Sequence, residues 1–221
     1  MKTIDTIRLR ATIGWLGMLL PWISLIMCAH FNCAGPYHIF PDSISITYHY
    51  APTITPFVII LGSAGILLMC YRGYSILDDV INSITGIVAL GICLFPCSYY
   101  GEGKIGTFQL SNMLSNRIHV ICALIFFVLL AYNSLFTFTK SSGVKTRNKK
   151  RRNVIYIVCG IGMVLSMLAL IPVIQNNIYG GTWAVEAVAL FFFGISYLTK
   201  ADIYSWLYCD TPTTDAEKDT I

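Results

Sequence analysis

The chain has 221 residues, of which 56% are hydrophobic and only 12% are charged, with a formal net charge of +4. Soluble domains carry about 25% charged residues, so this composition excludes an ordinary water-soluble fold. The hydrophobic residues also gather in long uncharged runs instead of alternating with polar ones. Both features indicate a membrane protein.

Six long runs predict membrane-spanning helices, and only the last contains a charged residue. In chain order they cover residues 11–29, 53–71, 80–98, 118–139, 154–174 and 183–199. A helix needs about 20 apolar residues to cross the hydrocarbon, with a tolerated range of about 17–25, and helices satisfy their own backbone groups in lipid. The predicted fold is an all-α, polytopic bundle of six transmembrane helices over residues 1–205, followed by a short acidic tail at 206–221.

The basic residues predict the orientation of this bundle. Of the 15, only Lys104 and Arg117 fall in the loops on the side opposite the termini. The others share the side of the termini: Lys2, Arg8, Arg10, Arg72, Lys140, Lys145, Arg147, Lys149, Lys150, Arg151, Arg152, Lys200 and Lys218. Because cytoplasmic loops carry an excess of Lys and Arg, we expect the N-terminus and the C-terminus in the cytoplasm.

The loops on the predicted outer side are enlarged, and a binding site is expected there. Loop one, residues 30–52, contains no Lys or Arg, and loop three, residues 98–117, is polar and Gly-rich at its start. The ligand-binding candidates in loop one are Asp42, Ser43, Ser45, Tyr48 and His49.

Glu186 is the only acid within a predicted span, about one turn from the outer end of its helix. Ionisable residues inside a membrane are costly and by default suggest function. By depth, the best partner for Glu186 is His119, and loop one could fold over both and add His49. In the competing, purely structural interpretation, Glu186 is protonated or hydrogen-bonded at the interface and His119 packs there.

Three kinds of chemistry are open to such a cluster. Two His and one Glu could bind a divalent metal, act as a general acid/base pair, or recognise a lipid head group. No HExxH or HxxxH spacing supports a metal, so no metal and no cofactor are expected. His49, His119 and Glu186 are therefore candidates, and no residue is assigned as catalytic.

At the inner hairpin between the second and third helices, Arg72, Asp78 and Asp79 lie close in sequence. An ion pair there is one interpretation. The preferred one is that Asp78 caps the N-terminus of the third helix and Arg72 anchors the second helix.

A basic run precedes the fifth helix and is expected to contact anionic lipid, since each basic residue contributes about 1 kcal/mol near such a surface. Because the run abuts a spanning helix, nucleic acid is not expected as a partner. Its members are Lys145, Arg147, Lys149, Lys150, Arg151 and Arg152.

The eight cysteines match neither a zinc site nor a disulfide scaffold. Cys28, Cys33, Cys93 and Cys97 lie towards the outside, where a bridge such as Cys33 to Cys97 is chemically permitted. Packing as small residues is the preferred interpretation. Cys209 could be palmitoylated in a eukaryotic host.

Several short motifs carry a resemblance that spans nearly the whole chain. They are the loop-one segment 40–49 (FPDSISITYH), the hairpin Tyr71-Arg72-Gly73-Tyr74, Phe95-Pro96, His119, Arg152-Asn153-x-x-Tyr156, Glu186 and residues 193–198 (FGISYL). This pattern resembles a six-helix superfamily that includes the damage-regulated autophagy modulators, the fibroblast-growth-factor-receptor-activating proteins linked to lipid remodelling, and uncharacterised bacterial membrane proteins, which look closest. The resemblance implies the six-helix topology and carries over no catalytic residue.

The expected function is that of a multi-pass protein of the bacterial inner membrane whose outer-facing polar pocket binds a lipid head group or a small ligand. The expected partners are membrane lipids, and homo-oligomerisation is left open. One alternative is a membrane-embedded lipid hydrolase or remodelling enzyme using His49, His119 and Glu186, although an enzyme is the less favoured class. The other is a proton-coupled small transporter or channel in which Glu186 titrates.

Overall fold

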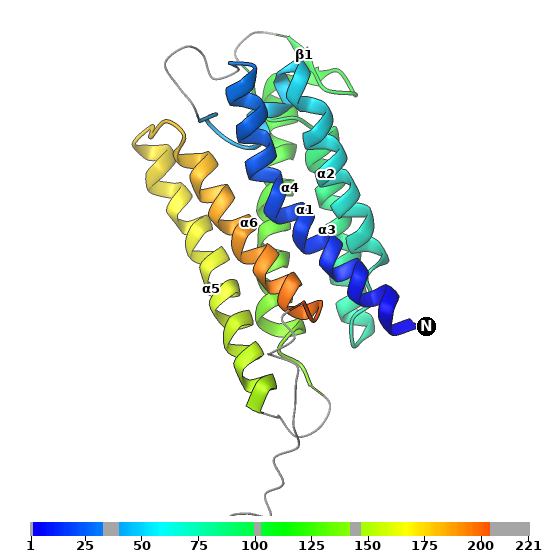
Figure 1. The fold of residues 1–221 in the computed structure, drawn as a ribbon. Coiled ribbons are helices and arrows are strands. Elements are labelled where there is room, and N and C mark those ends of the chain that lie inside the picture. Colours follow the sequence, from blue (N-terminus) through cyan, green and yellow to red (C-terminus); the bar gives the residue numbers. More distant parts are fainter. Residues whose placement is uncertain (1, 33–39, 100–102, 142–146, 204–221) are drawn as a thin grey trace, which may run out of the picture.

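The structure, a computed structural model, is a bundle of six long helices (Figure 1) and describes residues 2–32, 40–99, 103–141 and 147–203. The helices are α1 (Lys2–His30), α2 (Ala51–Cys70), α3 (Ile76–Leu94), α4 (Asn112–Tyr132), α5 (Arg147–Gln175) and α6 (Gly181–Lys200). All six contain a segment long and apolar enough to cross a membrane, which confirms the prediction of an all-helical bundle with six helices of membrane-spanning length. Lys145, Cys33, Cys209 and the predicted acidic tail lie outside the described residues.

Three short elements accompany the helices. A 3-10 helix, η1 (Ser45–His49), precedes α2, and a π-helix, η2 (Asn133–Thr137), continues α4. Strands β1 (Lys104–Ile105) and β2 (Leu110–Ser111) pair antiparallel, with Lys104 opposite Ser111. The sequence predicted none of these elements, because each is too short to leave a hydrophobic period.

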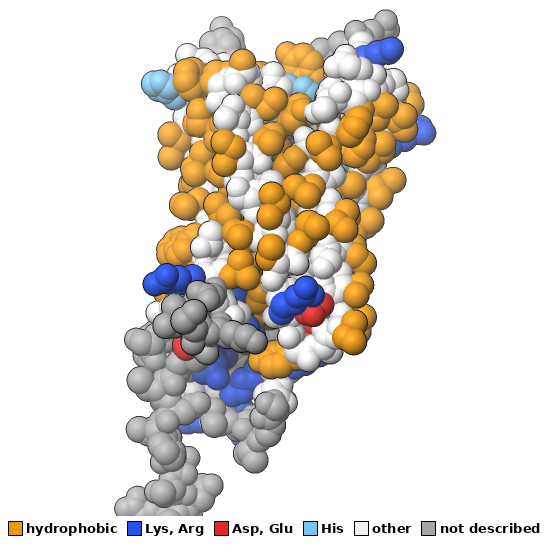
Figure 2. Space-filling view, turned by 90° about the vertical axis from the view of Figure 1, so that its right-hand side faces the viewer, with side chains coloured by type: hydrophobic (Ala, Val, Ile, Leu, Met, Phe, Trp, Pro, Cys, Tyr) orange, Lys and Arg blue, Asp and Glu red, His pale blue; other side chains and the backbone are white. Residues whose placement is uncertain are grey.

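The helices form a closed ring in which each packs against its neighbours in sequence and α6 packs against α1. Small residues permit the close approaches: a Cβ atom on Gly17 of α1 would overlap the Phe193 ring of α6, and one on Gly86 of α3 would overlap the Gly65 carbonyl of α2. On the face drawn in Figure 2, hydrophobic side chains cover most of the wall between the two ends, and most of the Lys and Arg side chains gather at the lower end. This distribution fits a wall in lipid and a charged end at a membrane surface.

The bounds of α3 differ from the predicted 80–98 for local reasons. Ser75 and Asp78 form a capping box that starts the helix early: Ser75 Oγ accepts from the Asp78 N–H at 3.4 Å, and Asp78 Oδ2 accepts from the Ser75 N–H at 3.1 Å. The helix ends at Leu94 because Phe95 precedes Pro96, and a residue before proline is disfavoured in the helical region. The predicted capping role of Asp78 is confirmed, with Ser75 as its reciprocal partner.

The basic run before the fifth helix is itself helical. Helix α5 begins at Arg147, earlier than the predicted start at residue 154, so Arg147 and Lys149–Arg152 form its first turns. At the hairpin between α2 and α3, Arg72 forms an ion pair with Asp79 at 3.3 Å.

Candidate functional site

Loop one docks on the start of α6 through backbone groups. The Trp183 N–H, one of the donors that a helix N-terminus leaves unpaired, donates to the Asp42 carbonyl at 3.0 Å. Two residues further along loop one, the Ile44 N–H donates to Glu186 Oε2 at 2.7 Å. The ring of Phe40 packs 5.1 Å from that of Trp183. This segment therefore lies against the first two turns of α6.

The polar residues of loop one build η1. Ser43 Oγ accepts from the Ile46 N–H at 3.0 Å, and the fully buried Thr47 donates its hydroxyl to the Ile44 carbonyl at 2.6 Å. The Thr53 hydroxyl on α2 donates in turn to the Thr47 carbonyl. Hydroxyl groups that bond to nearby backbone in this way favour turns over helices, which explains why the Ser-Ile-Ser segment forms a tight single turn.

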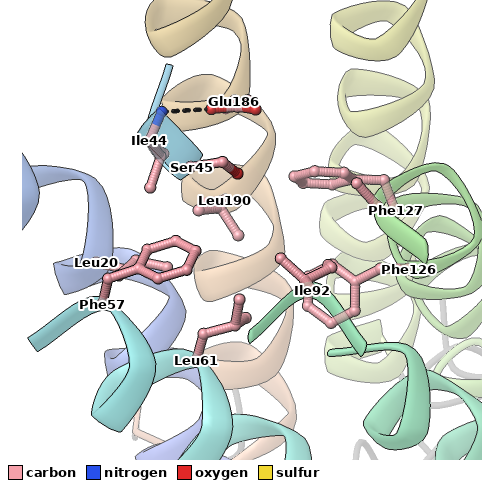
Figure 3. Close-up of a pocket in the computed structure, with 11 residues that line it drawn as sticks. Leu20, Ile44, Ser45, Phe57, Leu61, Ile92, Phe126, Phe127, Glu186 and Leu190 are labelled. Carbon is pink, nitrogen blue, oxygen red and sulfur yellow. Dashed lines mark hydrogen bonds between the residues drawn. The ribbon is translucent and has the colours of Figure 1, made fainter. Parts of the chain in front are cut away.

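Beneath η1 lies a small cavity of about 40 Å³, drawn in Figure 3. Its walls are almost entirely apolar, and its polar groups are the Glu186 carboxylate and Ser45. The bond from Ile44 to Glu186 runs along one end of it (Figure 3). The remaining lining residues come from α1, α2, α3, α4 and α6: Leu20, Phe57, Leu61, Ile92, Ala123, Phe126, Phe127 and Leu190.

The volume limits what the cavity can hold. A single water molecule needs about 10–15 Å³ of such a cavity. Sites for drug-sized ligands have volumes of about 300–1,000 Å³. As it stands, the cavity admits a few atoms, such as the end of a hydrocarbon chain. A whole head group would need η1 to move.

His49 forms its hydrogen bond with the connection between α3 and α4, not with Glu186. Its Nε2 donates to the Cys97 carbonyl at 2.8 Å, and its ring stacks on Tyr99 with centroids 4.8 Å apart. Burial lowers the pKa of His49, an effect that the bond to Cys97 opposes in part. Burial, with a smaller contribution from Glu186, raises the pKa of the Cys97 thiol to about 12, so this thiol stays protonated at neutral pH.

His119 holds the same connection from the other side. Its Nδ1 donates to the Phe95 carbonyl at 2.8 Å, and Ser115, one turn earlier on α4, donates to the Pro96 carbonyl at 2.8 Å. Asn116 accepts from the Ser98 N–H at 2.9 Å. Since residues 115, 116 and 119 share one face of α4, this face fastens the chain that leaves α3.

The structure therefore brings together only some of the predicted site residues. Ser45 and Glu186 line one cavity. Asp42 bonds to α6 through its backbone carbonyl, Ser43 supports η1, and Tyr48 packs its ring 6.4 Å from that of Phe57.

The two histidines bond to backbone carbonyls, and no hydrogen bond joins either of them to Glu186 within the described residues. Across the same part of the chain, no group of three or more His, Cys, Asp or Glu side chains is placed to hold a metal ion. Cys93 and Cys97 are free thiols.

A second polar cluster lies at the opposite end of the bundle, and of its members the sequence interpretation singled out only Asp78. Asp78 is fully buried and accepts from Lys140 at 2.6 Å. One turn further along α3, Asn82 accepts from Asn133 of η2 at 2.9 Å. The two asparagines within apolar runs were the available signal, because buried amides need partners.

No family model, no curated protein and no solved structure matches the chain. The resemblance to the six-helix superfamily stays a prediction.

Proposed function

We propose that this chain is a multi-pass membrane protein that binds a lipid or a small amphiphile from the outer leaflet, in the cavity beneath η1. The observation that carries this proposal is a carboxylate, Glu186, at one end of an otherwise apolar cavity. Such a cavity matches a molecule with a short hydrocarbon segment and a polar group at its end.

The chemistry of Glu186 narrows the ligand class. An ionised carboxylate only accepts hydrogen bonds, and Glu186 accepts one from the Ile44 N–H. A head group with hydroxyl or ammonium donors could replace this backbone donor, and η1 would then be released to admit it. The favoured ligand is therefore an amphiphile with a hydroxyl or amine head.

The orientation of the bundle forms part of the same proposal. The excess of Lys and Arg on the side of the termini supports a cytoplasmic location for both. The cavity then faces outward, and the inner membrane of a bacterium is the membrane that the resemblance favours.

Photo-crosslinking tests the ligand proposal. The full chain in membranes is irradiated with a diazirine-bearing monoacylglycerol, and labelled peptides are mapped. We expect labelling within α2, α4 or α6 around the cavity, and a loss of about tenfold or more in the Glu186→Leu variant, since a charge-assisted hydrogen bond contributes about 1.5–3 kcal/mol. Ala123→Leu, which fills the cavity, should abolish labelling without changing any charge.

The matched control is Glu217→Leu, which removes a glutamate from the tail sequence. Labelling of the control should equal that of the wild type. Equal labelling of Glu186→Leu, Ala123→Leu and the control would contradict a ligand in this cavity.

A further inference from the structure

The interface between α4 and α5 is tightly packed at the end of the bundle opposite η1. Ser134 of η2, which continues α4, donates its hydroxyl to the Tyr156 carbonyl of α5 at 2.8 Å. Gly160, one turn further along α5, lies so close to the Leu135 side chain that a Cβ atom there would overlap it. Ala131 shares the face of Leu135, one turn earlier on α4, and is buried. The two helices are therefore in direct contact at this end.

Towards η1, the same faces of α4 and α5 are uncovered. Leu124 and Val120 lie two and three turns before Ala131, so both share the face of α4 that is turned to α5. Their side chains are nevertheless 57% and 54% exposed. Ile171 lies three turns after Gly160 on α5 and is 54% exposed. Figure 1 shows the corresponding ends of α4 and α5 well apart.

The cavity beneath η1 borders on this uncovered end of the interface. Phe127 of α4 lines the cavity together with Glu186, and it lies between Leu124 and Ala131 on the face turned to α5. In Figure 3 the Phe127 ring extends from α4 towards α6, the helix that carries Glu186. Glu186 itself is half-buried. Phe127 therefore borders both the cavity and the uncovered end of the interface.

The size of the cavity requires a second place for any ligand with an acyl chain. A volume of about 40 Å³ holds only a few atoms, since one water molecule needs about 10–15 Å³. Most of an amphiphile bound at Glu186 would extend beyond the cavity. The exposed side chains of Leu124, Val120 and Ile171 offer an apolar surface for it next to Phe127.

We propose that the ligand is a membrane lipid that enters from the side, between α4 and α5, with its head at Glu186 and an acyl chain against Leu124 and Ile171. This inference rests on the proposed function and narrows its ligand to a chain-bearing lipid that arrives through the bilayer. Phe127 is then the side chain that turns aside when the head passes. A second copy of the chain fits this place less well, because its apolar helix would bring no donor for the carboxylate.

Photo-crosslinking with two probes tests the route. The full chain in lipid vesicles is irradiated with a monoacylglycerol that carries a diazirine at the end of its acyl chain, or with one that carries it next to the head. The signal is the labelling that is lost in Glu186→Leu. Leu124→Trp places a large ring in the uncovered end of the interface. Ile125→Trp is the matched control, because Ile125 is also exposed but points about 100° away around the helix.

In wild type and Ile125→Trp, the chain-end probe should label α5 around Ile171 in a Glu186-dependent way. Leu124→Trp should lose this labelling, down to the level of Glu186→Leu. Because both tryptophans replace exposed side chains, the thermal midpoints of the two variants should match that of the wild type.

Three results would overturn the inference. Equal chain-end labelling of the two tryptophan variants, with head-end labelling of the cavity still dependent on Glu186, would exclude this route and leave the proposed function standing. If neither probe gives Glu186-dependent labelling, the proposed function and this inference both fall. If Leu124→Cys, in a chain whose native cysteines are replaced, forms a disulfide between two copies and the chain-end probe does not label α5, a second copy covers this end.

Discussion

At the scale of single residues, Asp78 shows how the bundle keeps a charge at the edge of its apolar wall. The carboxylate is fully buried, and Lys140 and two backbone N–H groups donate to it. Asp79, the next residue, instead pairs with Arg72, whose side chain is 76% exposed. Two adjacent acids thus have very different environments.

Asp78→Asn should lower the free energy of unfolding by about 2–3 kcal/mol, because it removes the charge that buried donors require. Asp79→Asn, the matched control, should cost about 1 kcal/mol or less, since its ion pair is exposed to water. Denaturant unfolding in detergent measures both. A cost for Asp78→Asn no larger than that for Asp79→Asn would show that the buried network contributes little.

His49 gives a dependence of stability on pH. Because burial lowers its pKa in the folded protein below the ordinary value of 6.5, the unfolded chain binds more protons as the solution becomes acidic. The contribution of His49 is therefore fully present above pH 6.5 and is lost as the pH falls below it.

His49→Gln, which keeps a donor for the Cys97 carbonyl, should flatten the decline of the thermal midpoint between neutral pH and about pH 5. His30→Gln, at the exposed end of α1, should keep the wild-type profile. An unchanged slope in His49→Gln would contradict a neutral, buried imidazole at this position.

At the scale of elements, close contacts between helices depend on glycine. Gly86 of α3 faces the carbonyl of Gly65 on α2, so a Cβ atom would meet backbone that cannot rotate away. Gly62, also on α2, has open surroundings, since its nearest neighbour is a Leu90 methyl carbon at 4.0 Å.

Gly86→Ala should therefore lower the thermal midpoint, although alanine favours the helix by about 1 kcal/mol. Gly62→Ala should leave it equal or higher, and identical midpoints for the two variants would contradict this packing of α2 on α3.

The sequence predicted the helices well because a helix that crosses a membrane needs a long run of apolar residues. It predicted the ends of the helices less well. The start of α3 depends on a capping box, and its last residue is set by Pro96. It could not predict η2, where a local π turn lets Asn133, Ser134 and Thr137 all bond inward, to Asn82, Ser196 and Asp78. For the site, Glu186 was predictable as a lone intramembrane acid. Its bond to the Ile44 N–H was not, because a backbone donor leaves no mark in the sequence.

At the scale of the whole molecule, the two ends of the bundle differ in chemistry. One end carries the cavity beneath η1, with Glu186 beside apolar walls. The other carries Lys200, which is buried beside the rings of Tyr74, Phe138 and Tyr156. The proposed function assigns the first end to the outer leaflet and therefore depends on the orientation of the bundle.

Labelling of single cysteines tests that orientation most directly. In a chain whose native cysteines are replaced, Lys104→Cys on β1 and Lys150→Cys on α5 place one thiol at each end, both at exposed positions. Intact cells are treated with a membrane-impermeant maleimide. The proposed orientation predicts labelling of Cys at position 104 in intact cells and at position 150 only after permeabilisation. The reverse pattern would contradict it.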